Sequence, residues 1–291
     1  MTFAGQRKWT SFFLVLPYLC TFLIFVGLPF LVAIVLAFVK LDLADKGSSK
    51  FVGFGNFVDV FNDPLFYKAL DSTGRYAILM VPSVIIIGFA MAMGMNAMTK
   101  GRDMVRTLIY LPSMLNVAAT GILWQWFFNN QFGLFNFGLQ SVGATSVPWI
   151  SDKSFAMPSV VIMSLWWTVG GTSVVLLTGL QQIPKVFIEA ASLDGANATA
   201  VFRKITIPML RPVLLFVFIT STIAAFQMFG QAFILTGGGP EFSTRGLVQY
   251  MYETAFNGYR FGYGAAIGWI LFAIVLVFAL GQARLVRSGR V

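Results

Sequence analysis

Six long stretches of this chain contain no aspartate, glutamate, lysine or arginine, and this pattern limits what the chain can fold into. An α-helix needs about 20 mainly apolar residues to cross about 30 Å of hydrocarbon, and each stretch is longer than that. The stretches cover residues 11–39, 76–99, 107–130, 154–182, 212–239 and 261–283. They predict an all-α membrane protein with six transmembrane helices, forming one membrane domain over residues 1–291. We expect kinks in the first helix at Pro17 and Pro29.

The remaining composition excludes several classes of protein. Hydrophobic residues make up 57% of the chain and charged residues 11%, too few to cover a soluble globule of this size. The basic residues lie between the apolar stretches rather than in an aromatic-rich basic stripe, so no nucleic-acid partner is expected. Cys20 is the single cysteine and histidine is absent, which removes the usual ligands of zinc and the usual partner of a catalytic serine. We therefore expect no catalytic residue, no metal site and no cofactor in this chain.

The charged residues also predict how the chain crosses the membrane. With the N-terminus inside, the cytoplasmic segments hold twelve basic and three acidic residues, whereas the outer segments hold eight of each. Lysine and arginine are retained on the cytoplasmic side, so both termini are predicted to lie in the cytoplasm. The outer segment 40–75 mixes five phenylalanines with charges, which predicts short helices on the outer surface.

The inner loop 183–211 is the most informative segment. Pro184 suits the first turn of a helix, and Gly195 suits a left-handed stop after about three turns. Between them, Val186, Ala190 and Leu193 share one face, and the small alanines would allow another protein to approach the helix backbone closely. Docking into a protein groove therefore fits this helix better than lying on lipid.

The same loop carries a family motif. Glu189-Ala190-Ala191, then three residues, Gly195, nine residues and Ile205-Thr206-Ile207-Pro208 resemble the EAA loop of ABC import permeases, with Ile207 where leucine is usual. The resemblance implies the fold of a type I ABC importer permease with a cytoplasmic EAA coupling helix. It also implies that this helix sits in a groove of an ATPase subunit. The contact residues implied are Glu189, Ala190, Ala191, Asp194 and Gly195.

Other segments resemble the carbohydrate-uptake branch of that family, in particular the first permease of maltose-type and glycerol-phosphate-type importers. They are Phe51-Val52-Gly53, Asp63-Pro64, Tyr110-Leu111-Pro112, Trp124-Gln125-Trp126-Phe127-Phe128-Asn129, Phe132-Gly133-Leu134 and Thr236-Gly237-Gly238-Gly239-Pro240. The resemblance implies a bacterial inner-membrane permease that moves a carbohydrate or related polyol. It implies three protein partners: a second permease, a dimer of ATP-binding subunits and an external solute-binding protein. The chain lacks a phosphate-binding Gly-x-x-x-x-Gly-Lys-Ser/Thr loop, so ATP and magnesium are expected on the ATPase.

Sugars need amides and hydroxyls for hydrogen bonds and aromatic rings for stacking. Gln227 and Gln231 lie one turn apart in the fifth stretch. The resemblance to the maltose permease places Gln227 at a sugar-contacting position and does the same for Trp167, Thr168 and Gly171, although these residue types differ from those of that permease. The further candidates on the third stretch are Trp124 and Asn129. Structural alternatives remain open: Gln227 could bond a neighbouring helix, Trp124 could pack or lie at the interface, and Gly88, Gly94, Gly170 and Gly171 could permit close helix packing.

Three other classes of membrane protein compete with this interpretation. An ion-coupled secondary transporter normally needs acidic residues within its spans, and these stretches contain none. A membrane enzyme would need catalytic side chains, and this chain has no histidine, no paired cysteines and no carboxylates within its apolar stretches. A passive channel would differ by purifying without an ATPase.

Overall fold

The computed structural model describes residues 3–41 and 49–288, with side chains from residue 12 to residue 284. Four charges that enter the topology count, Asp42, Asp45, Lys46 and Arg290, lie outside the described residues. The chain forms two compact units, one of residues 1–63 with 251–270 and one of residues 64–250 with 271–291. Helices dominate both units, and the predicted all-α membrane class is confirmed.

The first unit begins with two long apolar helices. Helix α1 (Phe3–Phe22) contains Pro17, and a π-turn at Leu23–Gly27 joins it to α2 (Leu28–Ala37). Pro29 follows that π-turn by two residues, and a wider turn spares the carbonyl groups that a proline ring would otherwise hit. The regular α-helical hydrogen bonding is therefore interrupted just before Pro29, within one continuous helical span over Phe12–Ala37. The kinks at Pro17 and Pro29 stay predictions.

A small motif closes the first unit. Strands β1 (Val39–Lys40) and β2 (Lys50–Phe51) pair antiparallel, and α3 (Gly55–Phe61) follows them. The buried Asn56 of α3 donates hydrogen bonds to the carbonyls of Ala37 and Val39, at 2.9 and 3.0 Å. A π-turn at Glu253–Asn257 leads into α14 (Phe261–Ser288), whose Gly262 lies against the Val39 carbonyl. The predicted short outer helices are thus represented by α3.

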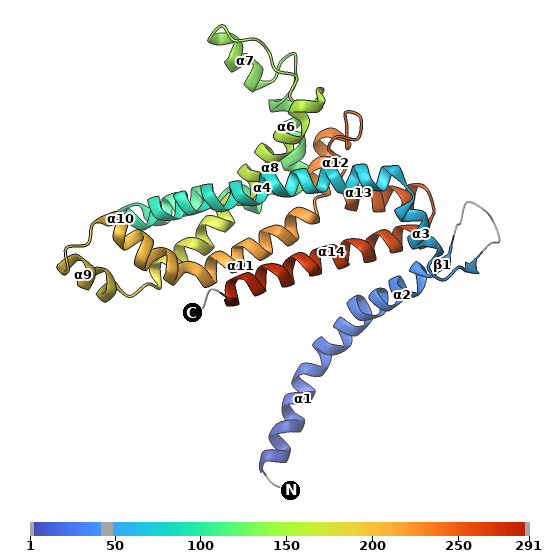
Figure 1. The fold of residues 1–291 in the computed structure, drawn as a ribbon, viewed down its shortest axis with the longest axis horizontal. Coiled ribbons are helices and arrows are strands. Elements are labelled where there is room, and N and C mark those ends of the chain that lie inside the picture. Colours follow the sequence, from blue (N-terminus) through green and yellow to red (C-terminus); the bar gives the residue numbers. More distant parts are fainter. Residues whose placement is uncertain (1–2, 42–48, 289–291) are drawn as a thin grey trace. The chain divides into compact units, whose positions relative to one another are not determined.

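The second unit is a bundle built on three long helices. These are α4 (Pro64–Ala97), α8 (Lys153–Gln181) and α11 (Ile207–Phe226), which run side by side (Figure 1). The end of α14 packs on α11 through Phe278 against Phe226 and through a 2.8 Å hydrogen bond from Gln282 to Thr222. Shorter elements complete the unit: α5 (Arg102–Tyr110), a 3-10 turn (Leu111–Met114), α6 (Val117–Phe127), α7 (Leu134–Ser141), α9 (Lys185–Leu193), α10 (Ala198–Val201), a π-turn (Phe202–Thr206), α12 (Gly230–Thr236) and α13 (Leu247–Tyr252).

Several helices differ in extent from the apolar stretches. Among the described residues, five helices are long and apolar enough to cross a membrane, or six if a bent pair counts as one span. Helix α4 begins at Pro64 rather than Tyr76, because a helix continues into water where its charged residues are solvated. The fifth helical segment already begins at Ala198 and ends at Phe226, and a π-turn at Phe202–Thr206 precedes Pro208 within it.

Two of the expected spans are interrupted. The third bends by 96° between residues 102–114 and α6, and the break at Leu115 and Asn116 lets the Asn116 side chain cap α6. The fifth breaks at Gln227–Phe229 before α12.

Glycines hold α6 and α12 close together. A Cβ on Gly121 of α6 would lie 2.5 Å from Ile234 of α12, and a Cβ on Gly230 of α12 would lie 3.1 Å from Val117 of α6. The Gln125 amide also donates to the carbonyls of Ile234 and Leu235. The C-terminal parts of the two broken spans, α6 and α12, therefore pack directly on each other.

Candidate functional site

Helix α9 lies beyond the ends of α8 and α11, away from the body of the second unit (Figure 1). Pro184 is its N-cap and the helix begins at Lys185, one residue later than predicted. Gly195 has φ +78°, which confirms the predicted left-handed stop, and the Ala196 amide donates to the Ala191 carbonyl at 2.9 Å. A proline and a glycine thus delimit this short helix.

The surface of α9 is apolar and uncovered. Val186 is 61% exposed, Phe187 50% and Leu193 89%. Glu189 is exposed on this helix and makes no ion pair within the described part of the chain. Exposed apolar side chains around an unpaired carboxylate are typical of a surface that another protein covers. The predicted contact residues Glu189, Ala190, Ala191, Asp194 and Gly195 therefore lie together on one accessible element.

Asn197 connects α9 to the bundle. Its side-chain oxygen accepts a 2.8 Å hydrogen bond from the Ala200 amide and starts α10, which continues through the π-turn into α11. Phe202 in that π-turn contacts Phe89 of α4, with ring centroids 6.0 Å apart. A displacement of α9 would therefore reach α11 and α4 directly.

A cavity of about 240 Å³ lies between α4, α8, α11 and α12. Polar side chains from all four helices line it, and no formal charge is among them: Tyr76, Thr168, Thr172, Thr220, Ser221 and Gln231. The hydroxyls of Thr168 and Thr220 donate to carbonyls of their own helices, at 2.7 and 2.8 Å. Their oxygen lone pairs remain able to accept hydrogen bonds from a ligand hydroxyl, and the Gln231 amide can both donate and accept.

Two of the predicted substrate candidates, Thr168 and Gln231, meet in this cavity. Gln227 is exposed at the break after α11 and is not among the lining residues. Trp167 and Gly171 face the broken third span instead, because the Trp167 indole donates to the Leu115 carbonyl at 2.9 Å and Gly171 lies beside the Tyr110 ring.

The other two candidates have visible structural roles. Trp124 is 5% exposed and packs against Phe127, Phe128, Phe135 and Trp166. The Asn129 side-chain oxygen accepts hydrogen bonds from the amides of Gln131 and Phe132 and so shapes the turn after α6. Neither residue lines the cavity.

Sequence reasoning missed four polar lining residues: Tyr76, Thr172, Thr220 and Ser221. One signal was available for Thr172, which lies one helical turn after Thr168 and therefore shares its face. The others come from helices whose facing sides the apolar stretches do not reveal.

Residues 84–290 match the family model of the binding-protein-dependent transport system inner membrane component. This match covers more than half of the chain and includes α9 and most of the cavity. The chain belongs to this permease family. It is therefore an inner-membrane, multi-pass component of a binding-protein-dependent transport system, as the EAA resemblance implied.

Relatives of this permease are similar along almost their whole length. It is 30% identical over 290 residues to the probable ABC transporter permease protein YurN of Bacillus subtilis, covering 98% of this chain and 99% of the relative. It is 31% identical over 283 residues to the trehalose/maltose transport system permease protein MalF of Thermococcus litoralis, covering 96% and 94%. The predicted role as the permease, rather than the ATPase, of an ABC transporter is confirmed.

A solved structure shares the fold of this permease. The similar chain belongs to a bacterial ABC transporter involved in the import of the acidic polysaccharide alginate. The two chains superpose with a TM-score of 0.86 at 23% sequence identity, over 98% of each. The predicted importer-permease fold is therefore confirmed.

Proposed function

We propose that this permease imports a carbohydrate or a related polyol and that α9 couples it to a separate ATPase. The observation that carries the coupling is α9 itself, a helix with exposed Val186, Phe187 and Leu193 around an unpaired Glu189. An exposed apolar helix lowers the solubility of a protein unless another protein covers it. In our proposal the ATPase groove covers it, with Glu189, Ala190, Ala191, Asp194 and Gly195 at the contact.

The uncharged cavity supports a carbohydrate substrate. Hydroxyl and amide groups from four helices match a ligand with many hydroxyls, and the relative MalF carries the name of a trehalose/maltose permease. Gln231 and Thr168 are the substrate contacts that we propose first. Five other candidates do not line the cavity, and they would contact substrate only if a partner subunit brought the ligand to them. They are Gln227, Trp167, Gly171, Trp124 and Asn129.

The size of the cavity supports a second permease. Pockets for small molecules usually have volumes of about 300–1,000 Å³, whereas this cavity has about 240 Å³. We propose that a related second permease supplies the other part of the site across the subunit interface. Membrane lipid would cover the remaining apolar surface of the spans.

The proposed topology and energy source follow from the charges. The excess of basic residues on the α9 side supports a topology in which both termini and α9 lie in the cytoplasm of a bacterial cell. A dimer of ATP-binding subunits would hold ATP and magnesium there, and no cofactor is proposed for this chain. ATP-driven closure of that dimer would move α9, and Asn197 and the π-turn at Phe202–Thr206 would pass the movement to α11.

Purification of the tagged permease in mild detergent tests this assembly. We expect mass spectrometry to identify a co-purifying ATPase and a second permease of the same family. A permease that is recovered alone and retains transport activity would contradict the proposal.

Substitution of Gln231 tests the cavity. Gln231→Ala should raise the KM for uptake by about tenfold, because a substrate hydroxyl loses a hydrogen-bond partner worth about 1–1.5 kcal/mol. Uptake of labelled sugars by whole cells measures this effect. Gln227→Ala, the same change at an exposed residue that does not line the cavity, should have a smaller effect. Equal effects of the two changes would remove the cavity from the substrate path.

A further inference from the structure

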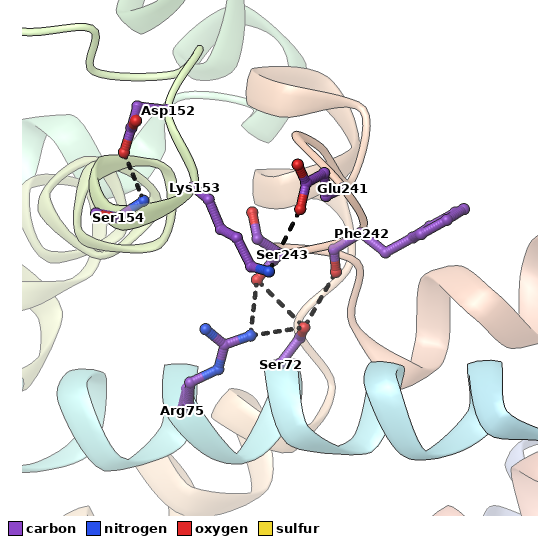
Figure 2. A network of polar contacts seen from close by, with 8 residues as sticks. All are labelled: Ser72, Arg75, Asp152, Lys153, Ser154, Glu241, Phe242 and Ser243. Carbon is purple, nitrogen blue, oxygen red and sulfur yellow. Dashed lines mark hydrogen bonds and ion pairs between the residues drawn. The ribbon is translucent and has the colours of Figure 1, made fainter.

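A second cavity, of about 530 Å³, lies at the N-terminal end of α8. Its walls are charged and polar, in contrast to the substrate cavity: Lys68, Asp71, Ser72, Arg75, Lys153, Glu241, Phe242 and Ser243. Figure 2 shows how α4, α8 and the turn at residues 237–246 meet there. Five ionisable side chains would be costly in hydrocarbon, so this cavity opens to water.

The cavity faces outward in the proposed topology. Helix α8 has 29 residues and is therefore about 43 Å long, enough to cross the bilayer. Its C-terminal end leads directly to α9, so a cytoplasmic α9 places the N-terminal end, with Lys153, on the outer side.

The turn at residues 237–246 is held in an unfavourable backbone conformation. Glu241 and Phe242 have φ of +50° and +62°, in the left-handed region that side chains rarely adopt. Ser72 donates to the carbonyls of Phe242 and Ser243, both at 3.2 Å, and Arg75 donates to the Ser243 carbonyl at 3.4 Å. Such conformations persist where surrounding contacts impose them, and they concentrate at binding sites and switches.

Short contacts connect this turn to the substrate cavity. The hydroxyl oxygens of Thr236 and Thr244 lie 2.6 Å apart, and the Gln249 amide donates to the Gly237 carbonyl at 3.0 Å. Thr236 ends α12, the seven-residue helix that carries Gln231. The turn therefore contacts the helix that carries Gln231, which lines the proposed substrate cavity.

The charges of the cavity leave one cation available. Arg75 pairs with Asp71 at 2.9 Å and Lys153 pairs with Glu241 at 3.4 Å. Lys68 is exposed and makes no ion pair among the described residues. A carboxylate from outside would complete this arrangement.

Resting on the function proposed above, we propose that this cavity is the docking surface for the solute-binding protein. That protein inserts an aspartate or glutamate beside Lys68, and the turn at residues 237–246 passes docking through α12 to Gln231. Because the family depends on a binding protein, an outer-side protein is the occupant favoured over a lipid headgroup or a small anion.

Photo-crosslinking in intact cells tests the occupant. A photoreactive amino acid at Phe242 should yield an adduct that mass spectrometry identifies as a solute-binding protein. The same amino acid at Leu193 should yield an ATPase adduct. An ATPase adduct at Leu193 with only lipid, or no adduct, at Phe242 would overturn the docking surface alone, whereas no ATPase adduct at Leu193 would contradict the proposed function.

Charge reversal tests the role of Lys68. The reconstituted transporter is titrated with the solute-binding protein that crosslinking identifies, and the concentration that gives half-maximal ATP hydrolysis is measured. Lys68→Glu should raise this concentration by about tenfold or more. Lys68→Gln should give a smaller rise, and Lys50→Glu, the same reversal at an exposed residue of the other unit, should give none. An unchanged concentration in both Lys68 variants would overturn the proposal.

Discussion

The variant Glu189→Lys should abolish uptake and substrate-stimulated ATP hydrolysis while leaving membrane insertion intact. Glu189 is an exposed carboxylate on α9, where no other described residue neutralises it. In the proposed complex Glu189 pairs with a cation of the ATPase groove, and a lysine buried at this position would lack a partner. Loss of such a charge pair costs about 3 kcal/mol, or roughly a hundredfold in affinity. Uptake of labelled sugar and the ATPase rate of the purified complex measure the two effects.

Two comparisons separate coupling from general damage. Asp103→Lys makes the same charge reversal on α5, where the side chain is 88% exposed, and should retain most of the uptake. The amount of Glu189→Lys protein in membranes should equal that of the unchanged permease, because α9 has no buried residue. Normal uptake by Glu189→Lys would remove α9 from the coupling path.

The variant Gly170→Ala should cause the largest loss of stability of any single methyl addition that we propose. A Cβ at Gly170 of α8 would overlap the Ile109 carbonyl and lie 3.0 Å from the Cα atom of Tyr110. Both contacts are with backbone, which cannot rotate away as a side chain can. Overpacking of this kind costs about 3 kcal/mol, which corresponds to a decrease in Tm of about 5–10 °C. Samples heated in detergent to a series of temperatures and then analysed by size-exclusion chromatography give the Tm and its decrease.

Gly94→Ala is the matched control for that variant. Gly94 lies on α4, and a Cβ there would meet no described atom within 4 Å. Its Tm should stay within about 2 °C of the original or rise, because alanine favours helix. Equal stability of the two alanine variants would show that α8 can move away from the third span without cost. Close packing was predicted for both glycines, and the structure shows it at Gly170 and not at Gly94.

The apolar stretches identified most of the membrane-crossing helices because hydrocarbon thickness acts directly on composition. They could not locate the ends of α4, since Lys68, Asp71 and Arg75 stop the apolar stretch without stopping the helix. They also gave no sign of the break at Leu115 and Asn116, where both flanking segments remain apolar. Hydropathy therefore reports the solvent around a segment, whereas hydrogen-bond geometry decides where the helix ends.

Helix α9 was predictable because its determinants are local. Pro184, Gly195 and the intervening alanines define its length and surface without help from the rest of the fold. The cavity is different, because Tyr76, Thr168, Thr220 and Gln231 come from four helices that must first be packed. Resemblance placed Thr168 near the substrate, but it also placed Trp167 there, and only the packing shows that Trp167 donates to the Leu115 carbonyl.

The lack of formal charge in the proposed substrate cavity has a consequence for how such importers diversify. Exchange of a threonine for a serine or of a glutamine for an asparagine would reshape the hydroxyl pattern that this half of the site recognises, at a small cost in desolvation. A switch from a neutral sugar to an acidic one would instead require a new cation within the membrane, which is expensive unless a partner surface supplies it. Inherited changes in this permease would thus readily alter selectivity among neutral sugars, whereas acquisition of an anionic nutrient would begin in the other permease.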